Sequence, residues 1–337
     1  SKSIGLPVLS SENFKNKVDR RNISQYNHDY NLILTMIDRF IGKDDTMKKI
    51  TLSGGFLVFL GAAFWSLNSP LVKYLSLDPV LICALRSVIA GIALAATIRP
   101  KQLSWNGWTL VYVVSYTGLC MSIILALGAT SAPVAIGMQY TATIWLFLVG
   151  LLRTHRFRFK SFLPVLVIFI GVVFFMCSGS DAASQKGNLI ALTEGVFFAL
   201  MTISSKKVAG KNPVGLSAVG NLFAGAAIFL FVPGTVGKMS VMTGLDWVIM
   251  LVLGVVQNGA GYAFYNYGIQ KVSAQKASVI ALWEMILGPV WVALFLKEYP
   301  QPTVLIGFVI ILLGMLMDAL LNSEAAPAEG EEIAIKN

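Results

Sequence analysis

The residue in this sequence whose setting most strongly indicates chemistry is Glu284. It lies near the middle of the apolar run AQKASVIALWEMILGPVWVALFLKE, residues 274–298, which is long enough to cross a bilayer as one helix. A carboxylate at the centre of a membrane helix costs about 2.5–3.5 kcal/mol even on lenient insertion scales, so it normally faces a bundle interior or a wet cavity. Glu284 is therefore predicted to bind a proton or the cationic group of a substrate, and the alternative is a structural hydrogen-bonding role.

A second group of candidates lies in the polar stretch GVVQNGAGYAFYNYG, residues 254–268. Asn258, Tyr262 and Tyr265 follow i, i+4, i+7 spacing, which places them on one face of a helix. That face is either the hydrogen-bonding, aromatic wall of a cavity or a surface for packing against another helix. Five further residues complete the predicted substrate-binding or coupling set: Trp65, Asn68, Gln139, Tyr140 and Trp283.

Four other polar residues inside apolar runs receive structural interpretations. Arg86 lies a few residues from the end of its run and is expected to snorkel to the interface or to pair with a carboxyl group. Glu194 is expected to pair with a basic residue. Asn266 and Tyr267 lie close to the end of their run, where a place in the interfacial aromatic belt is expected.

Composition argues against most other classes of protein. The 337 residues are 56% hydrophobic and 13% charged, with a mean hydropathy of +0.72, which is typical of membrane proteins. The net charge of +9 comes from short connectors between apolar runs, so nucleic-acid binding is not expected. The 2 histidines and 3 scattered cysteines suit neither a metal centre nor a disulfide framework, and no P-loop pattern occurs. We expect neither an enzyme nor a bound cofactor.

Ten apolar runs after Met47 approach the ~20 residues needed to cross a bilayer. They cover residues 53–73, 79–98, 107–126, 131–151, 161–178, 187–207, 214–233, 246–267, 274–296 and 303–321. Eleven basic residues fall in the connectors of one side: Arg99, Lys101, Arg153, Arg156, Arg158, Lys160, Lys206, Lys207, Lys211, Lys271 and Lys276. The other side holds four: Lys73, Lys186, Lys238 and Lys297. The positive-inside rule therefore predicts that both termini are cytoplasmic.

An internal repeat divides the ten runs into two groups of five. FWSLN at 64–68 aligns with FALMT at 198–202, and SAPVA at 131–135 aligns with SAQKA at 273–277. An odd number of spans per half reverses the orientation of the second half, which gives an inverted repeat. The expected fold is an all-α integral membrane protein with two inverted five-helix halves, 47–180 and 181–321. A polar extension, 1–46, either non-native or a cytosolic tail, precedes them, and an acidic cytosolic tail, 322–337, follows.

Four segments carry a resemblance to a known family: GAAFWSLNSPLVKYLSLDPV at 61–80, ALRSVIAGIALA at 84–95, IALWEMILGPVWVALFLKE at 280–298 and IGFVIILLGMLM at 306–317. In order and spacing they resemble the EamA type of the drug/metabolite transporter superfamily, over residues 51–321. Met285 and Lys297 depart from the family pattern. The resemblance implies ten helices around a central cavity that admits small organic metabolites or drugs.

On this basis we predict a secondary transporter of the inner (plasma) membrane. It would export amino acids or related small metabolites by alternating access, in the lipid bilayer, as a monomer or a homodimer, with the proton as a candidate coupling ion. One alternative is a carrier or flippase of lipid headgroups or quaternary amines. The other is a membrane scaffold or sensor that transports nothing, for which the short loops offer little surface.

Overall fold

The computed structural model describes residues 53–178, 182–208, 210 and 212–322. Every helix described below belongs to one compact unit, which begins at Leu52. The predicted extension over 1–46 and the acidic tail beyond Asn322 lie outside the described residues.

The described residues are folded as helices joined by short connections, and no strand occurs among them. Within these described ranges, ten helical segments are long and apolar enough to cross a membrane, which confirms the ten predicted spans to within a few residues at each end. The helices are α2 (Gly54–Ser66), α3 (Asn68–Tyr74), α4 (Pro79–Leu94), α5 (Gly107–Ala129), α6 (Ala132–Gln139), α7 (Ala142–Thr154), α8 (Phe159–Met176), α9 (Ala182–Val208), α10 (Pro213–Phe231), α11 (Gly244–Leu251), the π-helix η4 (Val252–Ala260), α12 (Gly261–Ile269), α13 (Ala274–Leu296) and α14 (Pro302–Leu321).

Three of the ten spans are interrupted near their middle. The first span changes from α2 to α3 at Leu67, three residues before Pro70, which has no N–H to offer the carbonyl one turn earlier. The fourth changes from α6 to α7 at Tyr140 and Thr141, although no proline stands there. The eighth consists of α11, η4 and α12, and its π-helical turns are of a kind that occurs often at functional sites.

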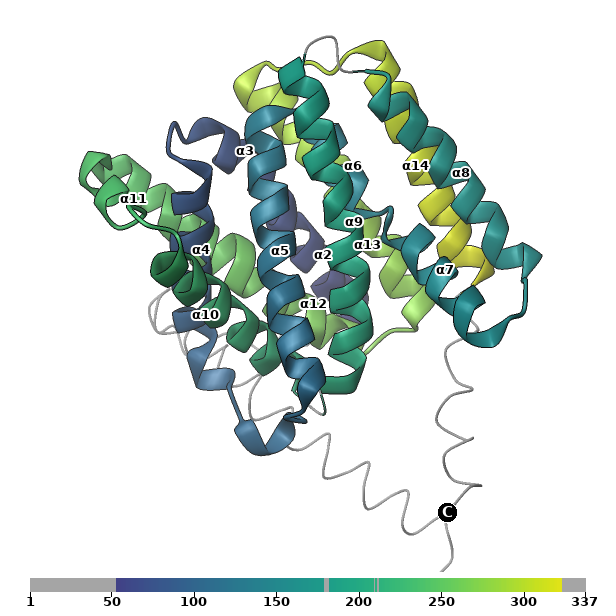
Figure 1. The fold of residues 1–337 in the computed structure, drawn as a ribbon, viewed down its shortest axis with the longest axis horizontal. Coiled ribbons are helices and arrows are strands. Elements are labelled where there is room, and N and C mark those ends of the chain that lie inside the picture. Colours follow the sequence, from purple (N-terminus) through teal and green to yellow (C-terminus); the bar gives the residue numbers. More distant parts are fainter. Residues whose placement is uncertain (1–52, 179–181, 209, 211, 323–337) are drawn as a thin grey trace, which may run out of the picture. The chain divides into compact units, whose positions relative to one another are not determined.

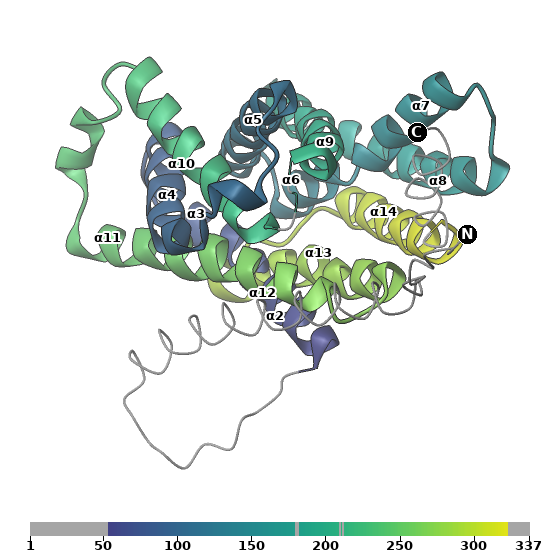
Figure 2. The same ribbon diagram turned by 90° about the horizontal axis from the view of Figure 1, so that it is seen from below.

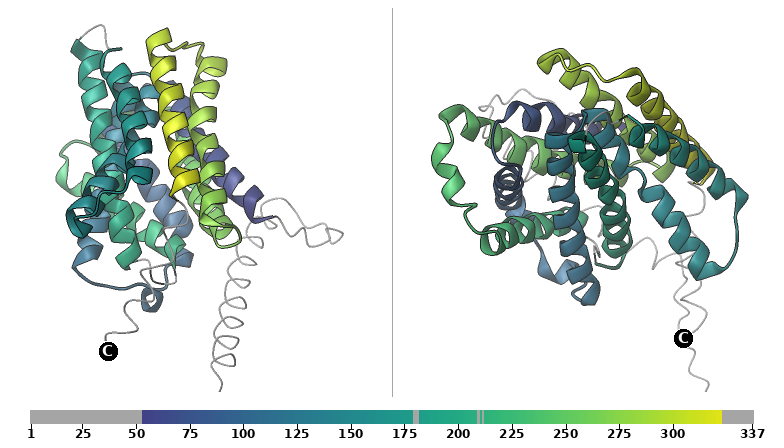
Figure 3. Two further views of the ribbon diagram at one scale, coloured as in Figure 1. Left: turned by 90° about the vertical axis from the view of Figure 1, so that its right-hand side faces the viewer. Right: turned by 45° about the horizontal axis from the view of Figure 1, so that its top comes forward.

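The spans pack in pairs that are distant in sequence. Helix α5 lies along α9, α4 along α10, and α8 along α14 (Figures 1 and 2). Figure 3 shows α14 between α8 and α13. The contact of α8 with α14 depends on two facing glycines, since a Cβ atom built on Gly307 would lie 2.9 Å from the carbonyl oxygen of Gly171. Only hydrogen at these positions lets the two backbones approach so closely.

An ion pair joins two segments at one end of this helical unit. Asp78 caps α4 by accepting the backbone N–H groups of Val80 and Leu81, and its other oxygen accepts Lys238 Nζ at 2.7 Å. Burial raises the pKa of the Asp78 carboxyl, but the hydrogen bonds and the charge of Lys238 outweigh it and hold the pKa below the ordinary value of 3.8. Asp78 thus joins the start of α4 to the connection between α10 and α11.

Because this pKa is lower in the folded protein than in the unfolded chain, Asp78 stabilises the fold above about pH 4, and its contribution is lost as pH falls through the lowered pKa. We expect Asp78→Asn to lower the thermal unfolding midpoint at pH 7 and to have little effect at pH 3. The measurement is thermal unfolding of the purified protein in detergent at both pH values. An equal loss at both pH values would show that the charge of Asp78 is not the source of its stabilising effect.

Candidate functional site

A cavity of about 700 Å³ lies among the spans, and most of the predicted site residues line it. Eight of the nine do so: Trp65, Asn68, Gln139, Tyr140, Asn258, Tyr262, Tyr265 and Glu284. Arg86, Tyr112, Cys120, Met201, Thr202, Ser205, Ser217 and Gln257 also contribute to the wall. The lining comes from nine of the ten spans, so no single helix or sequence segment defines this site.

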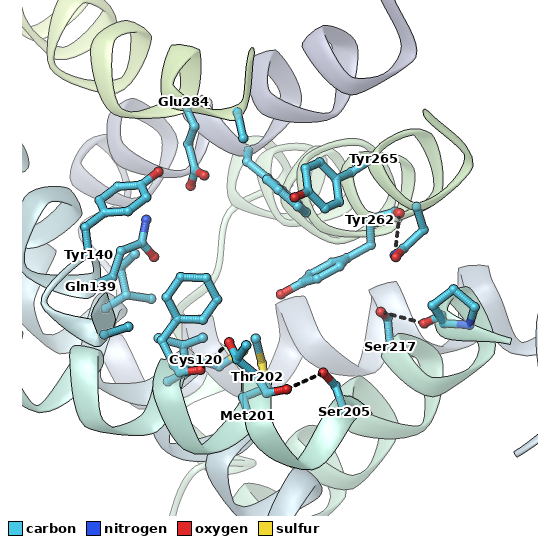
Figure 4. Close-up of a pocket in the computed structure, with 18 of the residues that line it drawn as sticks. Cys120, Gln139, Tyr140, Met201, Thr202, Ser205, Ser217, Tyr262, Tyr265 and Glu284 are labelled. Atoms are coloured by element: carbon cyan, nitrogen blue, oxygen red, sulfur yellow. Dashed lines mark hydrogen bonds between the residues drawn. The ribbon is translucent and has the colours of Figure 1, made fainter. Parts of the chain in front are cut away.

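Glu284 projects from the middle of α13 into the cavity. In Figure 4 its carboxylate points into the open centre, with Gln139 and Tyr140 on one side and Tyr262 and Tyr265 on the other. The side chains of Gln139 and Tyr140 interact with it. Both stand where α6 ends and the chain turns before α7, so the break in the fourth span carries them to the acid. Glu284 therefore has neutral hydrogen-bonding neighbours, and no ion pair of Glu284 occurs within the described residues.

An aromatic cluster forms the wall beside the acid. The ring of Trp65 lies 4.7 Å from that of Tyr265 and 5.0 Å from that of Tyr262, centroid to centroid. Gly261 lets α12 approach α2 closely enough for this contact, because a Cβ there would meet the indole at 2.6 Å. Such a cluster can accept a cationic group on the ring faces or an apolar side chain.

A buried amide network supports the wall from behind. Asn258 Nδ2 donates to Asn221 Oδ1 at 2.8 Å, and Asn221 Nδ2 donates to the hydroxyl oxygen of Tyr116 at 2.7 Å. Asn258 thus lines the cavity and also joins η4 to α10. Its face of the helix is therefore both a wall of the cavity and a packing surface. Asn221 and Tyr116 were not singled out from the sequence. An asparagine in the middle of an apolar run was the available signal.

Arg86 occupies a position that differs from the prediction. Instead of snorkelling to an interface, it is buried with 4% of its surface exposed, and its Nη1 donates to Asn68 Oδ1 at 2.7 Å. Both residues line the cavity. The predicted carboxyl partner is also absent, since no ion pair of Arg86 occurs within residues 53–322 as far as they are described.

Three other interpretations of polar residues are wrong. Glu194 on α9 is completely buried, and both of its carboxylate oxygens lack hydrogen-bond partners in the described part of the chain, so it does not pair with a basic residue. Asn266 and Tyr267 are 8% and 9% exposed, so they do not face outward as residues of an aromatic belt would, and Asn266 lines the cavity. In each case the residue points inward because α9 and α12 are surrounded by other spans.

Trp283 is the one predicted site residue that lies elsewhere. It is 45% exposed and packs edge-on against Phe59, at a centroid distance of 5.9 Å. Successive residues of an α-helix point about 100° apart, so the turn that directs Glu284 into the cavity directs Trp283 outward. The structure therefore gives no support to a binding role for Trp283.

The described residues contain no group of three histidine, cysteine, aspartate or glutamate side chains that could hold a metal ion. The cavity instead offers isolated charges, amides, hydroxyls and aromatic rings. Such a lining can bind an organic molecule by hydrogen bonds, stacking and charge pairing.

Comparison with known proteins gives a consistent picture. Residues 185–318 match the model of the EamA-like transporter family. An uncharacterized transporter of Archaeoglobus fulgidus is 24% identical over 66% of this chain and 83% of its own length. The uncharacterized transporter YwfM of Bacillus subtilis is 21% identical over 82% and 97%, and one from Clostridium kluyveri is 25% identical over 81% and 94%.

A solved crystal structure has the same fold, with a TM-score of 0.57 and 18% identity, over 81% of this chain and 98% of that one. The fold likeness thus extends well beyond the segment that the family model matches. The ten apolar spans also agree with the multi-pass membrane fold expected of the family. The resemblance to EamA-type transporters of the drug/metabolite transporter superfamily, seen in the sequence motifs, is confirmed by the family match and by relatives that are named transporters.

Proposed function

We propose that this protein is a secondary transporter of the inner (plasma) membrane that exports amino acids or related small metabolites by alternating access, with Glu284 as a proton-coupling group. The observation that carries the proposal is the cavity of about 700 Å³ among the spans, into which a carboxyl group projects without a cationic partner in the described residues. An intramembrane acid facing a cavity is the usual arrangement for a proton relay. The names of the relatives support transport, and export is taken from the family resemblance.

The packing pattern supports the inverted repeat that alternating access requires. Helix α2 of the first span packs on the eighth and ninth spans, through α12 and α13. Helix α9 of the sixth span packs on the third and fourth, through α5, α6 and α7. The first span is the counterpart of the sixth, the eighth of the third, and the ninth of the fourth. The two sets of contacts are therefore equivalent, as two related halves would require.

The cavity extends to one end of the helical unit. Lys206, Pro213, Ile269 and Ser278 line it, and they lie beside the connections from α9 to α10 and from α12 to α13. At the same end, Asn212 Nδ2 donates to the Thr97 carbonyl at 2.7 Å, so the connection after α4 lies there too. These three connections and the helix ends beside them carry seven basic residues: Arg99, Lys101, Lys206, Lys207, Lys211, Lys271 and Lys276. By the positive-inside rule we therefore assign this end to the cytoplasm and the conformation as inward-facing.

The orientation can be tested by cysteine labelling. We expect a membrane-impermeant maleimide to label Ser240→Cys in intact cells and to label Thr154→Cys only after permeabilisation. Both side chains are exposed; Thr154 is the last residue of α7, and Ser240 lies in the connection between α10 and α11. Cys177→Ser removes the exposed native thiol. Labelling of both from outside would contradict the assignment.

Uptake into reconstituted vesicles tests the function itself. A labelled panel of neutral amino acids, choline and phosphoethanolamine is measured with and without an imposed pH gradient, in both vesicle orientations. We expect amino-acid transport that the gradient accelerates. Transport of choline or phosphoethanolamine alone would favour the headgroup or quaternary-amine carrier instead, and no transport of any member would oppose the proposal.

A further inference from the structure

The buried guanidinium of Arg86 has fewer partners than its chemistry requires. A guanidinium has five N–H donors, and one, on Nη1, reaches Asn68 Oδ1 at 2.7 Å. Its Nε is buried and has no hydrogen-bond partner in the described residues. Cys120, a weak and neutral acceptor in its thiol form, is a further neighbour.

No protein anion neutralises this charge among the described residues. Lys73 pairs with Glu298 and Lys238 pairs with Asp78, and both ion pairs lie at the ends of the spans. Glu194 and Glu284 are the acids nearest the membrane centre, and neither forms an ion pair with Arg86. A buried charge without a counter-charge is strongly destabilising, so an anion from outside the chain would relieve that cost.

Arg86 and Glu284 lie at different depths of one cavity. Arg86 is about two helical turns from Pro79, where its span begins, and Glu284 is about two turns from Lys276, at the opposite end of the spans. Tyr262 and Trp65 line this cavity together with both charged residues. A single ligand between the two charges would therefore contact the Tyr262 and Trp65 rings, which lie 5.0 Å apart.

We infer that Arg86 is the anion-binding residue of the cavity and takes the carboxylate of a small amino-acid-like zwitterion whose ammonium group faces Glu284 and the aromatic cluster. This inference rests on the proposed transport function and names its substrate class. The forked guanidinium matches the two oxygens of a carboxylate, whereas the unpaired Glu284 attracts a cation. Asn68 holds the guanidinium in place from α3.

Binding of four probes to the purified protein tests the inference by isothermal titration calorimetry. They are L-phenylalanine, phenethylamine (which lacks the carboxylate), 3-phenylpropionate (which lacks the ammonium) and O-phosphoethanolamine (which has a phosphate as its anionic group and lacks the phenyl ring). We expect phenylalanine to bind at least about tenfold more tightly than phenethylamine and 3-phenylpropionate, because each of these lacks one group that would form a charge-assisted hydrogen bond. Phenylalanine should also bind more tightly than O-phosphoethanolamine, which lacks the ring that would contact the aromatic cluster. Arg86→Gln should weaken phenylalanine binding by a similar factor and leave phenethylamine binding unchanged, and Arg86→Lys should be intermediate.

Equal binding of phenylalanine and phenethylamine by the wild type would overturn the inference, and this arm needs no variant to fold. Wild-type phenylalanine affinity in Arg86→Gln or Arg86→Lys would also overturn it, as would tighter binding of O-phosphoethanolamine or no binding of phenylalanine at millimolar concentration. If vesicles still transport a metabolite without an anionic group, the proposed function survives while this inference fails.

Discussion

Replacement of Glu284 by glutamine is expected to abolish the response of transport to a pH gradient while substrate exchange remains measurable. The amide keeps the shape of the side chain and can still bond to Gln139 and Tyr140, but it cannot bind and release a proton. We expect the rate of gradient-driven transport in vesicles to fall by about tenfold or more, which corresponds to a rise of about 1.4 kcal/mol in the activation free energy. Exchange of labelled for unlabelled substrate should fall less, and most for substrates with an ammonium group.

Two comparisons separate this effect from a structural one. Glu284→Leu removes the hydrogen bonds as well as the charge, so thermal unfolding should distinguish loss of folding from loss of coupling. Trp283→Leu changes the neighbouring side chain, which faces outward, and should leave the pH response intact. Wild-type coupling in Glu284→Gln would leave Glu284 with a structural role alone.

Replacement of Gly307 by leucine is expected to have the largest effect on folding. A Cβ on Gly307 would lie 2.9 Å from the carbonyl oxygen of Gly171 and 2.9 Å from Phe174 Cβ. Backbone atoms cannot rotate away as a side chain can, so α8 and α14 would have to separate. Overpacking of cores typically costs about 1–3 kcal/mol, and we expect a loss at the upper end of that range or beyond it. The measurement is the unfolding midpoint in detergent, together with the yield of folded protein.

Gly150 provides the matched control. It also lies in a helix of this bundle, but a Cβ built on it meets nothing within 4 Å. Gly150→Leu should therefore be neutral or slightly stabilising, because it also removes the cost of glycine in a helix, about 1 kcal/mol. Equal losses at both positions would show that the close contact between α8 and α14 is not what holds these spans together.

The sequence by itself determined the spans and the depth of Glu284. An apolar run of about 20 residues predicts a membrane helix whatever its neighbours are, because the bilayer sets the length. The same local rule placed Glu284 near the centre of its run, and helical spacing correctly placed Asn258, Tyr262 and Tyr265 on one face, which lines the cavity. The repeat and the motif order likewise led to the family that the comparisons support.

The tertiary structure alone decided which side of a helix faces the cavity wherever no row of polar residues marks that side. In a membrane both lipid and helix neighbours are apolar, so the sequence pattern does not separate an outward face from an inward one. Trp283 and Glu284 are adjacent in sequence, yet one faces out and the other in. The burial of Arg86 and Glu194 depends on helices that are distant in the chain. The same holds for the turn at Tyr140, where the sequence has no proline that would predict it. These features arise from contacts between spans, which no local sequence rule contains.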